Sequence, residues 1–178
     1  EKRGETPFAK APVYKNPLLP INQRIEDLLL RMSLKEKVGQ MNMPVCFETK
    51  LGWGLGSNQP RHLWEMDEKN KEVREKQLEG CRKWAEGMHN NIIGQGGGFL
   101  SLSDRLIYEG PKRQAETLNE LQKIAIEKTR LGIPLFQVEE GTHGLACAGG
   151  TIFPEGLAIG ASWNKDLVKR IYTVVAKE

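Results

Sequence analysis

The chain has 178 residues and a formal net charge of +3, and 39% of its residues are hydrophobic. A chain of this length and apolar content can bury a core, which excludes a disordered tail. The charges are spread over helical faces and no apolar run is long enough to cross a membrane, so neither nucleic acid nor a membrane is expected as a partner.

The first twenty residues contain four prolines among mixed charges. This composition favours an extended N-terminal arm, residues 1–20, that lies on a larger body. The chain begins with Glu1 instead of Met, which fits either a cleaved export signal or a trimmed sequence.

Two helices are predicted next. From Ile21 to Met32, apolar residues recur at helical spacing, so one face of this segment is expected to lie against a core. Ser33 and Glu36 have the spacing of a capping box, which predicts the start of a second helix at Ser33. The buried face of this second helix is expected to comprise Leu34, Val38 and Met41.

Residues 44–64 indicate a long loop, because prolines and glycines interrupt any period. Trp53 and Trp64 lie in this loop and could stack on a sugar ring or anchor the loop by packing. From Glu65 to His89 the helical pattern returns, with an apolar side formed by Val73, Leu78, Cys81, Trp84 and Met88.

The glycine cluster Gly94–Gly98 lies within a strand predicted over residues 91–102. It does not match a dinucleotide-binding fingerprint, because Phe99 stands where that pattern needs glycine and a strand follows where a helix should begin. Close approach of the backbone to a neighbour is the expected role of these glycines.

Another helix is predicted from Pro111 to about Leu131, with Gly132 as its left-handed cap. Its inward face is expected to comprise Ala115, Leu118, Leu121 and Ala125. The apolar run from Ile133 to Val138 then predicts a fully buried strand of a parallel sheet.

A polar, glycine-rich turn, residues 139–150, follows that strand directly, and α/β folds place ligand-binding groups at such turns. The last predicted helix is capped by Asn164 and is expected to bury Leu167, Val168, Ile171 and Val175. The alternation of strands and helices predicts an α/β domain that is either a small sheet or an incomplete barrel.

Glu139, Glu140 and His143 form the most distinctive cluster. Adjacent strand residues project to opposite faces, so the two glutamates cannot serve as a catalytic carboxylate pair. One is expected to enter a pocket and the other to pack or to pair with a cation, unless both are solvated. Gly141 and Gly144 oppose a helix, so the Glu140-x-x-His143 spacing predicts no metal site. His143 by itself suits a structural or a catalytic role.

The cysteines Cys46, Cys81 and Cys147 are an odd number with wide spacings, which matches neither a disulfide framework nor a zinc site. Small buried apolar residues are the expected role, with a disulfide between two of them as the alternative.

Three segments together, Arg24–Met41, Leu131–Gly144 and Thr151–Ile171, resemble the N-terminal part of glycoside hydrolase family 3. The resemblance implies an incomplete (β/α)8 TIM-type barrel over residues 21–178, cut short at its C-terminal end. It implies a retaining exo-β-glycosidase that removes terminal β-linked glucose or xylose, and a parent enzyme whose nucleophile and acid/base lie outside this chain. A periplasmic or secreted location is expected, and no cofactor.

On the same resemblance, Glu140 corresponds to the acidic sugar ligand that precedes the His-Gly turn of His143, so both residues are expected to bind substrate. Members acting on glucosides often carry aspartate there, and the longer glutamate leaves less room for a hydroxymethyl group, which suggests a preference for β-xylosides. The expected partners are an oligosaccharide or β-glycoside substrate and the remainder of the same polypeptide. The alternative function is a non-catalytic carbohydrate-binding or scaffolding fragment.

Overall fold

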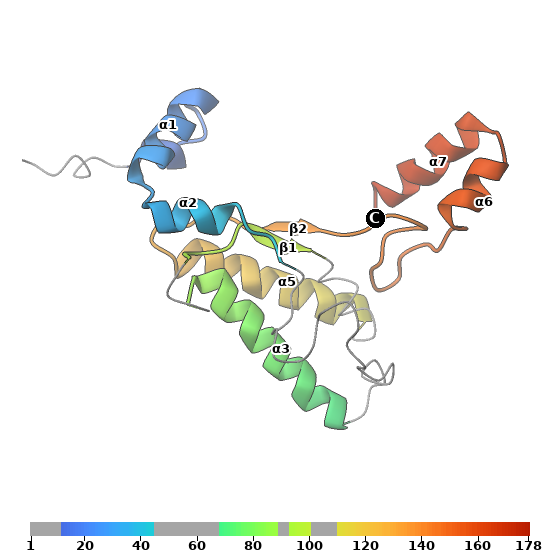
Figure 1. Cartoon of the computed structure of the whole chain (residues 1–178), viewed down its shortest axis with the longest axis horizontal. Helices are drawn as coiled ribbons and strands as arrows, with labels where there is room; N and C mark the ends of the chain where they lie inside the picture. Colours follow the sequence, from blue (N-terminus) through green and yellow to red (C-terminus); the bar gives the residue numbers. More distant parts are fainter. Residues whose placement is uncertain (1–11, 45–67, 89–92, 101–109) are drawn as a thin grey trace, which may run out of the picture.

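The computed structural model describes residues 12–44, 68–88, 93–100 and 110–178 (Figure 1). Its elements in chain order are the 3-10 turn η1 (Val13–Lys15), α1 (Ile21–Arg31), α2 (Leu34–Gln40), α3 (Glu68–Glu86), β1 (Gly98–Leu100), α5 (Gly110–Glu127), β2 (Phe136–Val138), α6 (Gly156–Ala161) and α7 (Lys165–Val175). Among the described residues, no helix is long and apolar enough to span a membrane.

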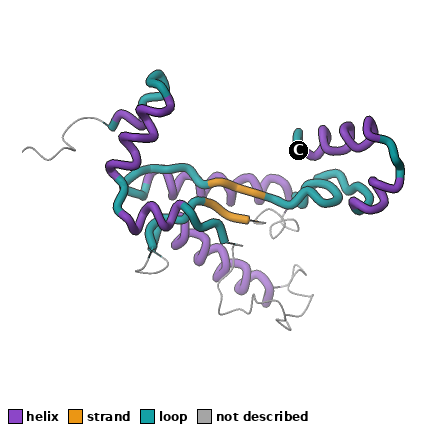
Figure 2. The backbone as a smooth tube through the Cα atoms, turned by 45° about the horizontal axis from the view of Figure 1, so that its top comes forward, coloured by secondary structure: helices purple, strands orange, loops and turns teal. Residues whose placement is uncertain are grey.

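Two short parallel strands, β1 and β2, form the sheet, and α5 connects them along the chain. In their register Gly98 pairs with Phe136, and Leu100 pairs with Val138. The two strands run side by side with helices around them in Figure 2. A helix that links two neighbouring parallel strands is the repeating unit of α/β folds. The predicted α/β class is therefore confirmed.

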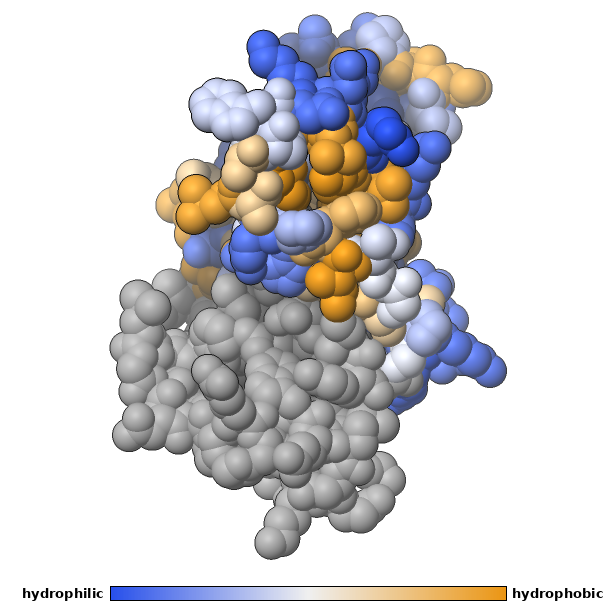
Figure 3. Space-filling model, turned by 90° about the vertical axis from the view of Figure 1, so that its right-hand side faces the viewer, coloured by the Kyte–Doolittle hydropathy of each residue, from blue (hydrophilic) through white to orange (hydrophobic). Residues whose placement is uncertain are grey.

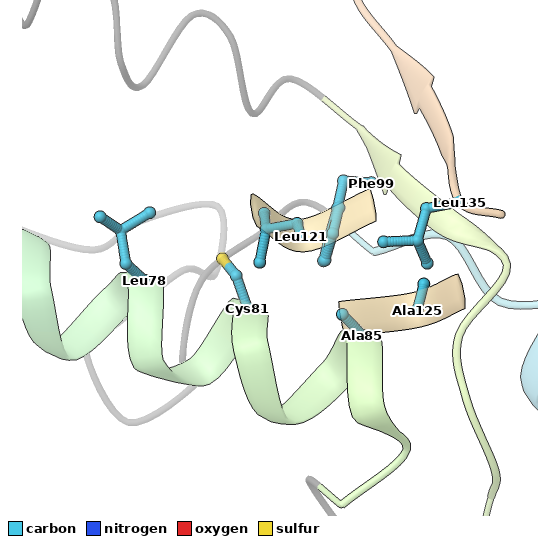
Figure 4. Close-up of a cluster of buried hydrophobic side chains, with 7 residues drawn as sticks. All are labelled: Leu78, Cys81, Ala85, Phe99, Leu121, Ala125 and Leu135. Carbon is cyan, nitrogen blue, oxygen red and sulfur yellow. The ribbon is translucent and has the colours of Figure 1, made fainter. Parts of the chain in front are cut away.

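The buried core lies where α3 and α5 pack against the strands. Its members are Leu78, Cys81 and Ala85 on α3, Leu121 and Ala125 on α5, Phe99 on β1 and Leu135 just before β2 (Figure 4). At the edge of the same helix pair, the Nε atom of Arg82 donates a hydrogen bond to Oε1 of Glu120 over 2.7 Å. Apolar burial joins the two helices, and the charged pair adds a polar link beside it.

The cysteines differ in their state. Cys81 is buried, as predicted, and is also disulfide-bonded, which is the alternative that the sequence left open. Cys147 is a free, half-buried thiol whose pKa is raised by burial, so it stays protonated near neutral pH. Cys46 and the loop of residues 45–64, with its two tryptophans, lie outside the described residues.

Gly96 and Gly97 before β1, and Gly98 at its start, lie too close to their neighbours for any side chain. A Cβ atom on Gly96 would overlap the indole ring of Trp84, and one on Gly97 would overlap the carbonyl oxygen of Gln40. A Cβ on Gly98 would meet the carbonyl oxygen of Phe136 on the neighbouring strand. The predicted role of this cluster in close backbone approach is confirmed.

The prediction that residues 133–138 form a fully buried strand is wrong. Leu135 is buried, but Phe136 is 73% exposed and Gln137 and Val138 are exposed as well. Within the described part of the chain, β2 pairs with β1 along one edge, and all three of its residues are exposed. An apolar run thus marks the strand correctly, but it does not show what covers that strand.

Most of the apolar side chains of α1 and α2 are also exposed, contrary to prediction. Both helices form where expected, and Ser33 and Glu36 make the predicted capping box. Their exposed apolar side chains are Ile21, Ile25, Leu29, Leu30, Leu34, Val38 and Met41, whereas Leu28 and Met32 are half-buried. Polar groups and the buried Gly39 join these two helices to the rest of the described chain, while most of their apolar side chains remain exposed.

The inward face of α5 is rotated relative to the prediction. Leu121 and Ala125 are buried as expected and Leu118 is partly buried, but Ala115 is exposed. Gln114 and Thr117 occupy the buried positions of the first two turns instead. The helix ends at Glu127, earlier than predicted, and Gly132 adopts the left-handed conformation with φ of 64°.

The remaining helices match their predicted positions with small differences. Met88, beyond the end of α3, is exposed, whereas Trp84 packs against the core. The side chain of Asn164 caps α7 as predicted, and Ile171 is buried while Leu167 is exposed. The short helix α6 was not predicted.

A polar network joins the N-terminal elements to the segment before β2. The hydroxyl group of Tyr14 donates to the carbonyl oxygen of Leu131 over 2.6 Å. Arg130 donates to Oε2 of Glu36 over 2.6 Å and to the carbonyl oxygen of Arg31 over 2.8 Å. These hydrogen bonds attach η1 and α1 to the segment that leads into β2.

Candidate functional site

Glu139 and Glu140 follow β2 directly, at the edge of the sheet where both parallel strands end. The side chain of Glu139 is half-buried and its Oε2 atom is buried, whereas Glu140 is exposed. The two neighbouring carboxylates therefore lie in different environments.

His143 lies on the same loop, three positions after Glu140. Its Nε2 atom is 3.8 Å from Oε1 of Glu155, and its carbonyl oxygen accepts a hydrogen bond of 2.6 Å from the backbone N–H of Phe153. Both contacts of His143 are with residues at the other end of the loop, Phe153 and Glu155. The structure places the two predicted sugar ligands on one loop and joins His143 to residues 153–155.

The loop of residues 143–153, here called the β2–α6 loop, is closed on itself. Besides the Phe153 bond at its base, the N–H of Gly150 donates to the carbonyl oxygen of Cys147 over 3.1 Å. Gly144 has φ of 118° and passes so close to the carbonyl oxygen of Thr151 that no Cβ would fit. Both ends of the loop are therefore held together by a backbone hydrogen bond and by this close contact.

No helix covers residues 139–155, as the glycines predicted. Glu140 and His143 therefore do not share a helical face, which a di-metal carboxylate site would need. Among the residues that the structure describes, no group of three or more His, Cys, Asp or Glu side chains is arranged to hold a metal ion.

A cavity of about 290 Å³ lies at the opposite end of the strands. It is bordered by α2, by the end of α3 at Glu86 and Gly87, by Gly94 and Gln95 before β1, and by residues 128–131 and Ile133 before β2. Glu140 does not line it, so this cavity is not the predicted sugar pocket. In parallel α/β barrels the carboxyl ends of the strands carry the ligand sites and the amino ends serve stability.

Gln114, on the first turns of α5, is a site neighbour that the sequence prediction missed. Its side chain is only 6% exposed, and its Oε1 atom accepts a hydrogen bond of 3.0 Å from the backbone N–H of Ala148 in the β2–α6 loop. A polar residue seven positions before the buried Leu121 lies on the same helical face. That spacing is the signal that could have identified it.

The chain is similar to a known protein family and to several curated proteins. The model of the family described as the glycosyl hydrolase family 3 N-terminal domain matches residues 33–178. A Formosa agariphila protein named as a beta-xylosidase is 32% identical over 171 residues, which cover 96% of this chain and 19% of that protein. Proteins of Aspergillus flavus and Aspergillus oryzae named as beta-glucosidase C are each 30% identical, over 94% of this chain and 23% of each relative.

The chain thus spans about a fifth of the length of these curated relatives. The family match covers well over half of the chain, and it includes β1, α5, β2 and the loop that carries Glu140. The chain therefore belongs to glycosyl hydrolase family 3, and residues 33–178 are part of the N-terminal domain of that family.

Proposed function

We propose that this chain is the front part of the barrel domain of a retaining exo-β-glycosidase that removes terminal β-linked glucose or xylose. The family assignment supports glycoside hydrolysis, and the relatives are named as a beta-xylosidase and beta-glucosidases. The nucleophile and the acid/base would lie in parts of the parent protein beyond these 178 residues. The parent would act on a β-glycoside or an oligosaccharide.

The proposed fold is the beginning of a (β/α)8 barrel. The unit β1–α5–β2 has the strand–helix–strand order of such a barrel, with α3 packed on the same core as α5. A barrel places the next strand beside β2 and further side chains over its faces, which would cover Phe136 and Val138. Their present exposure supports this continuation.

The observation that carries the proposed site is the position of Glu140. Its exposed carboxylate follows β2 at the carboxyl end of a parallel strand, where barrel enzymes bind their substrates. A carboxylate at that place can accept hydrogen bonds from the hydroxyl groups of a sugar ring. We place His143 beside it as the second sugar-binding residue, because the closed β2–α6 loop holds its backbone in place.

The longer side chain of glutamate, compared with aspartate, supports a preference for xylosides. It would reach further into the terminal-sugar site and leave less room for the hydroxymethyl group that distinguishes glucose from xylose. For scale, one methylene group more or less on a substrate changes selectivity by roughly 10–200-fold in a hydrophobic pocket.

The test is hydrolysis of nitrophenyl β-xyloside and nitrophenyl β-glucoside by the full-length protein. We expect a higher kcat/KM on the xyloside, and we expect Glu140→Asp to shift the ratio toward the glucoside. Glu140→Gln should weaken both reactions, since it removes the charge that accepts the sugar hydroxyls. The matched control is Glu127→Gln, an exposed glutamate at the end of α5, which should change neither. A strong glucoside preference of the unaltered protein contradicts the xyloside assignment.

We further propose a periplasmic or secreted location. The disulfide bond of Cys81 supports it, because disulfides form and persist in oxidising compartments and are rare in the cytosol. Fractionation of the source cells, followed by detection of the protein, tests the location. Recovery of the protein mainly in the cytosolic fraction would contradict it.

A further inference from the structure

Gln114 reaches from α5 to a loop that lies 34 positions further along the chain. Because α5 returns the chain from the end of β1 to the beginning of β2, its first turn lies at the edge of the sheet where the strands end. The β2–α6 loop hangs beside that end of α5 in Figure 1. Gln114 therefore lies near the carboxyl ends of the strands, as Glu140 does.

The burial of Gln114 shows that its amide group is used. A buried amide without a hydrogen bond destabilises the fold, whereas an apolar side chain at the same position would pack on the helix without that penalty. The Oε1 atom of Gln114 accepts the N–H of Ala148 over 3.0 Å, at the middle of the β2–α6 loop. This bond ties a loop without regular structure to a helix that belongs to the core.

The hydrogen bond from Ala148 to Gln114 restrains a loop that is itself closed by two backbone hydrogen bonds. The bond from Gly150 to Cys147 closes its tip, and the bond from Phe153 to His143 closes its base. The chain segment between the end of β2 and His143 has only four residues, and Glu140 is one of them. The position of the loop body thus limits where Glu140 and His143 can lie.

We propose that Gln114 is a positioning residue that fixes the β2–α6 loop and, through it, the two proposed sugar-binding residues Glu140 and His143. This inference rests on the proposed function, since it assigns Gln114 to the same site. Gln114 does not touch the sugar. It acts through the N–H of Ala148, and its loss would loosen the loop and lower the affinity for the sugar.

The test uses the full-length protein and three variants. Gln114→Met keeps a similar length and removes the acceptor, whereas Gln114→Glu keeps an oxygen that can accept the N–H of Ala148. The control is Gln95→Met. Gln95 has nearly the same exposure, 7% against 6%, and donates one side-chain hydrogen bond of 2.7 Å to the backbone of Ile133, but it lies at the opposite end of the strands.

Gln114→Met is expected to raise KM for nitrophenyl β-xyloside about fivefold, the affinity equivalent of one ordinary hydrogen bond, with kcat within about twofold. Gln95→Met should lower the unfolding temperature and leave KM unchanged. Gln114→Glu should restore KM although its buried charge lowers the unfolding temperature. A merely structural role would instead make KM follow stability in all three variants.

Hydrogen exchange of the loop amides gives a second measurement that does not need activity. Gln114→Met should speed the exchange of residues 143–153, and Gln95→Met should not. An unchanged KM in Gln114→Met, an equal rise of KM in Gln95→Met, or unchanged loop exchange overturns the inference. A parent protein without activity on either glycoside contradicts the proposed function instead, and the exchange data then decide alone whether Gln114 holds the loop.

Discussion

Gly96 lies against the indole ring of Trp84, and Trp84 donates its indole N–H to the carbonyl oxygen of Gly98 over 3.2 Å. The backbone ahead of β1 can approach α3 this closely only because Gly96 has no side chain. The glycine cluster was recognised from the sequence as a place of close approach. Its partner was not, because nothing in the spacing of the residues links Trp84 to Gly96.

Gly96→Ala is therefore expected to destabilise the protein by about 1–3 kcal/mol, the usual cost of forcing extra volume into a packed site. The measurement is the urea midpoint of unfolding. Gly80→Ala is the matched control: Gly80 lies in α3 with open space around it, so alanine there should be neutral or stabilising by about 0.5–1 kcal/mol. Equal effects of the two substitutions would contradict the described contact.

At the scale of elements, the sequence predicted where the helices lie along the chain better than it predicted which of their faces are buried. Helical periodicity placed α1, α2 and α7, and the capping side chains of Ser33 and Asn164 were identified from residue type alone. The rotation of α5 was missed because its inner face includes the polar residues Gln114 and Thr117. A rule that counts apolar residues assigns such positions to solvent, although the hydrogen bond of Gln114 to Ala148 permits the burial of that side chain.

Glu36 couples α2 to the segment before β2, and its charge makes this coupling depend on pH. Burial raises the pKa of Glu36, but hydrogen bonds from Arg130 and Ser33 outweigh it, so the pKa lies below that of an ordinary glutamate. A carboxylate with a depressed pKa in the folded state stabilises the fold above its unfolded pKa, about 4.3, and this stability is lost as the pH falls through the folded pKa.

Glu36→Gln should therefore lower the unfolding temperature near neutral pH and have a smaller effect below about pH 4. Thermal unfolding across that range measures the difference. Glu26→Gln, at an exposed glutamate on α1, provides the control and should leave the curve unchanged. A constant difference between Glu36→Gln and the unaltered protein at every pH would contradict the role assigned to the charge.

At the scale of the whole molecule, apolar side chains lie on surfaces that a folded protein would normally cover. Figure 3 shows hydrophobic residues gathered on the face that α6 and α7 present. The strongly exposed ones in this part of the chain include Ile152, Leu157 and Trp163, at 83%, 92% and 94%. Neither these exposures nor that of Phe136 could be predicted from the sequence, because an apolar pattern does not identify the surface that will cover it.

The purified 178-residue polypeptide is accordingly expected to bind the dye ANS and to self-associate, since uncovered apolar patches and open strand edges favour both. We also expect no hydrolysis of nitrophenyl xyloside or glucoside by this polypeptide, because the proposed nucleophile lies outside it. Dye fluorescence, sedimentation and a glycosidase assay measure these outcomes. A monomer that binds no dye, or one that hydrolyses either substrate, would show that the chain forms a complete unit.

The contact of Trp84 with Gly96 and Gly98 also gives the protein an intrinsic fluorescence signal. The indole of Trp84 is held by Gly98 and pressed against Gly96, whereas Trp163 is surrounded by solvent. In a variant in which the other tryptophans, Trp53, Trp64 and Trp163, are replaced by phenylalanine, the emission wavelength of Trp84 would report when β1 docks on α3. Assembly of the sheet could then be followed in time without any added label.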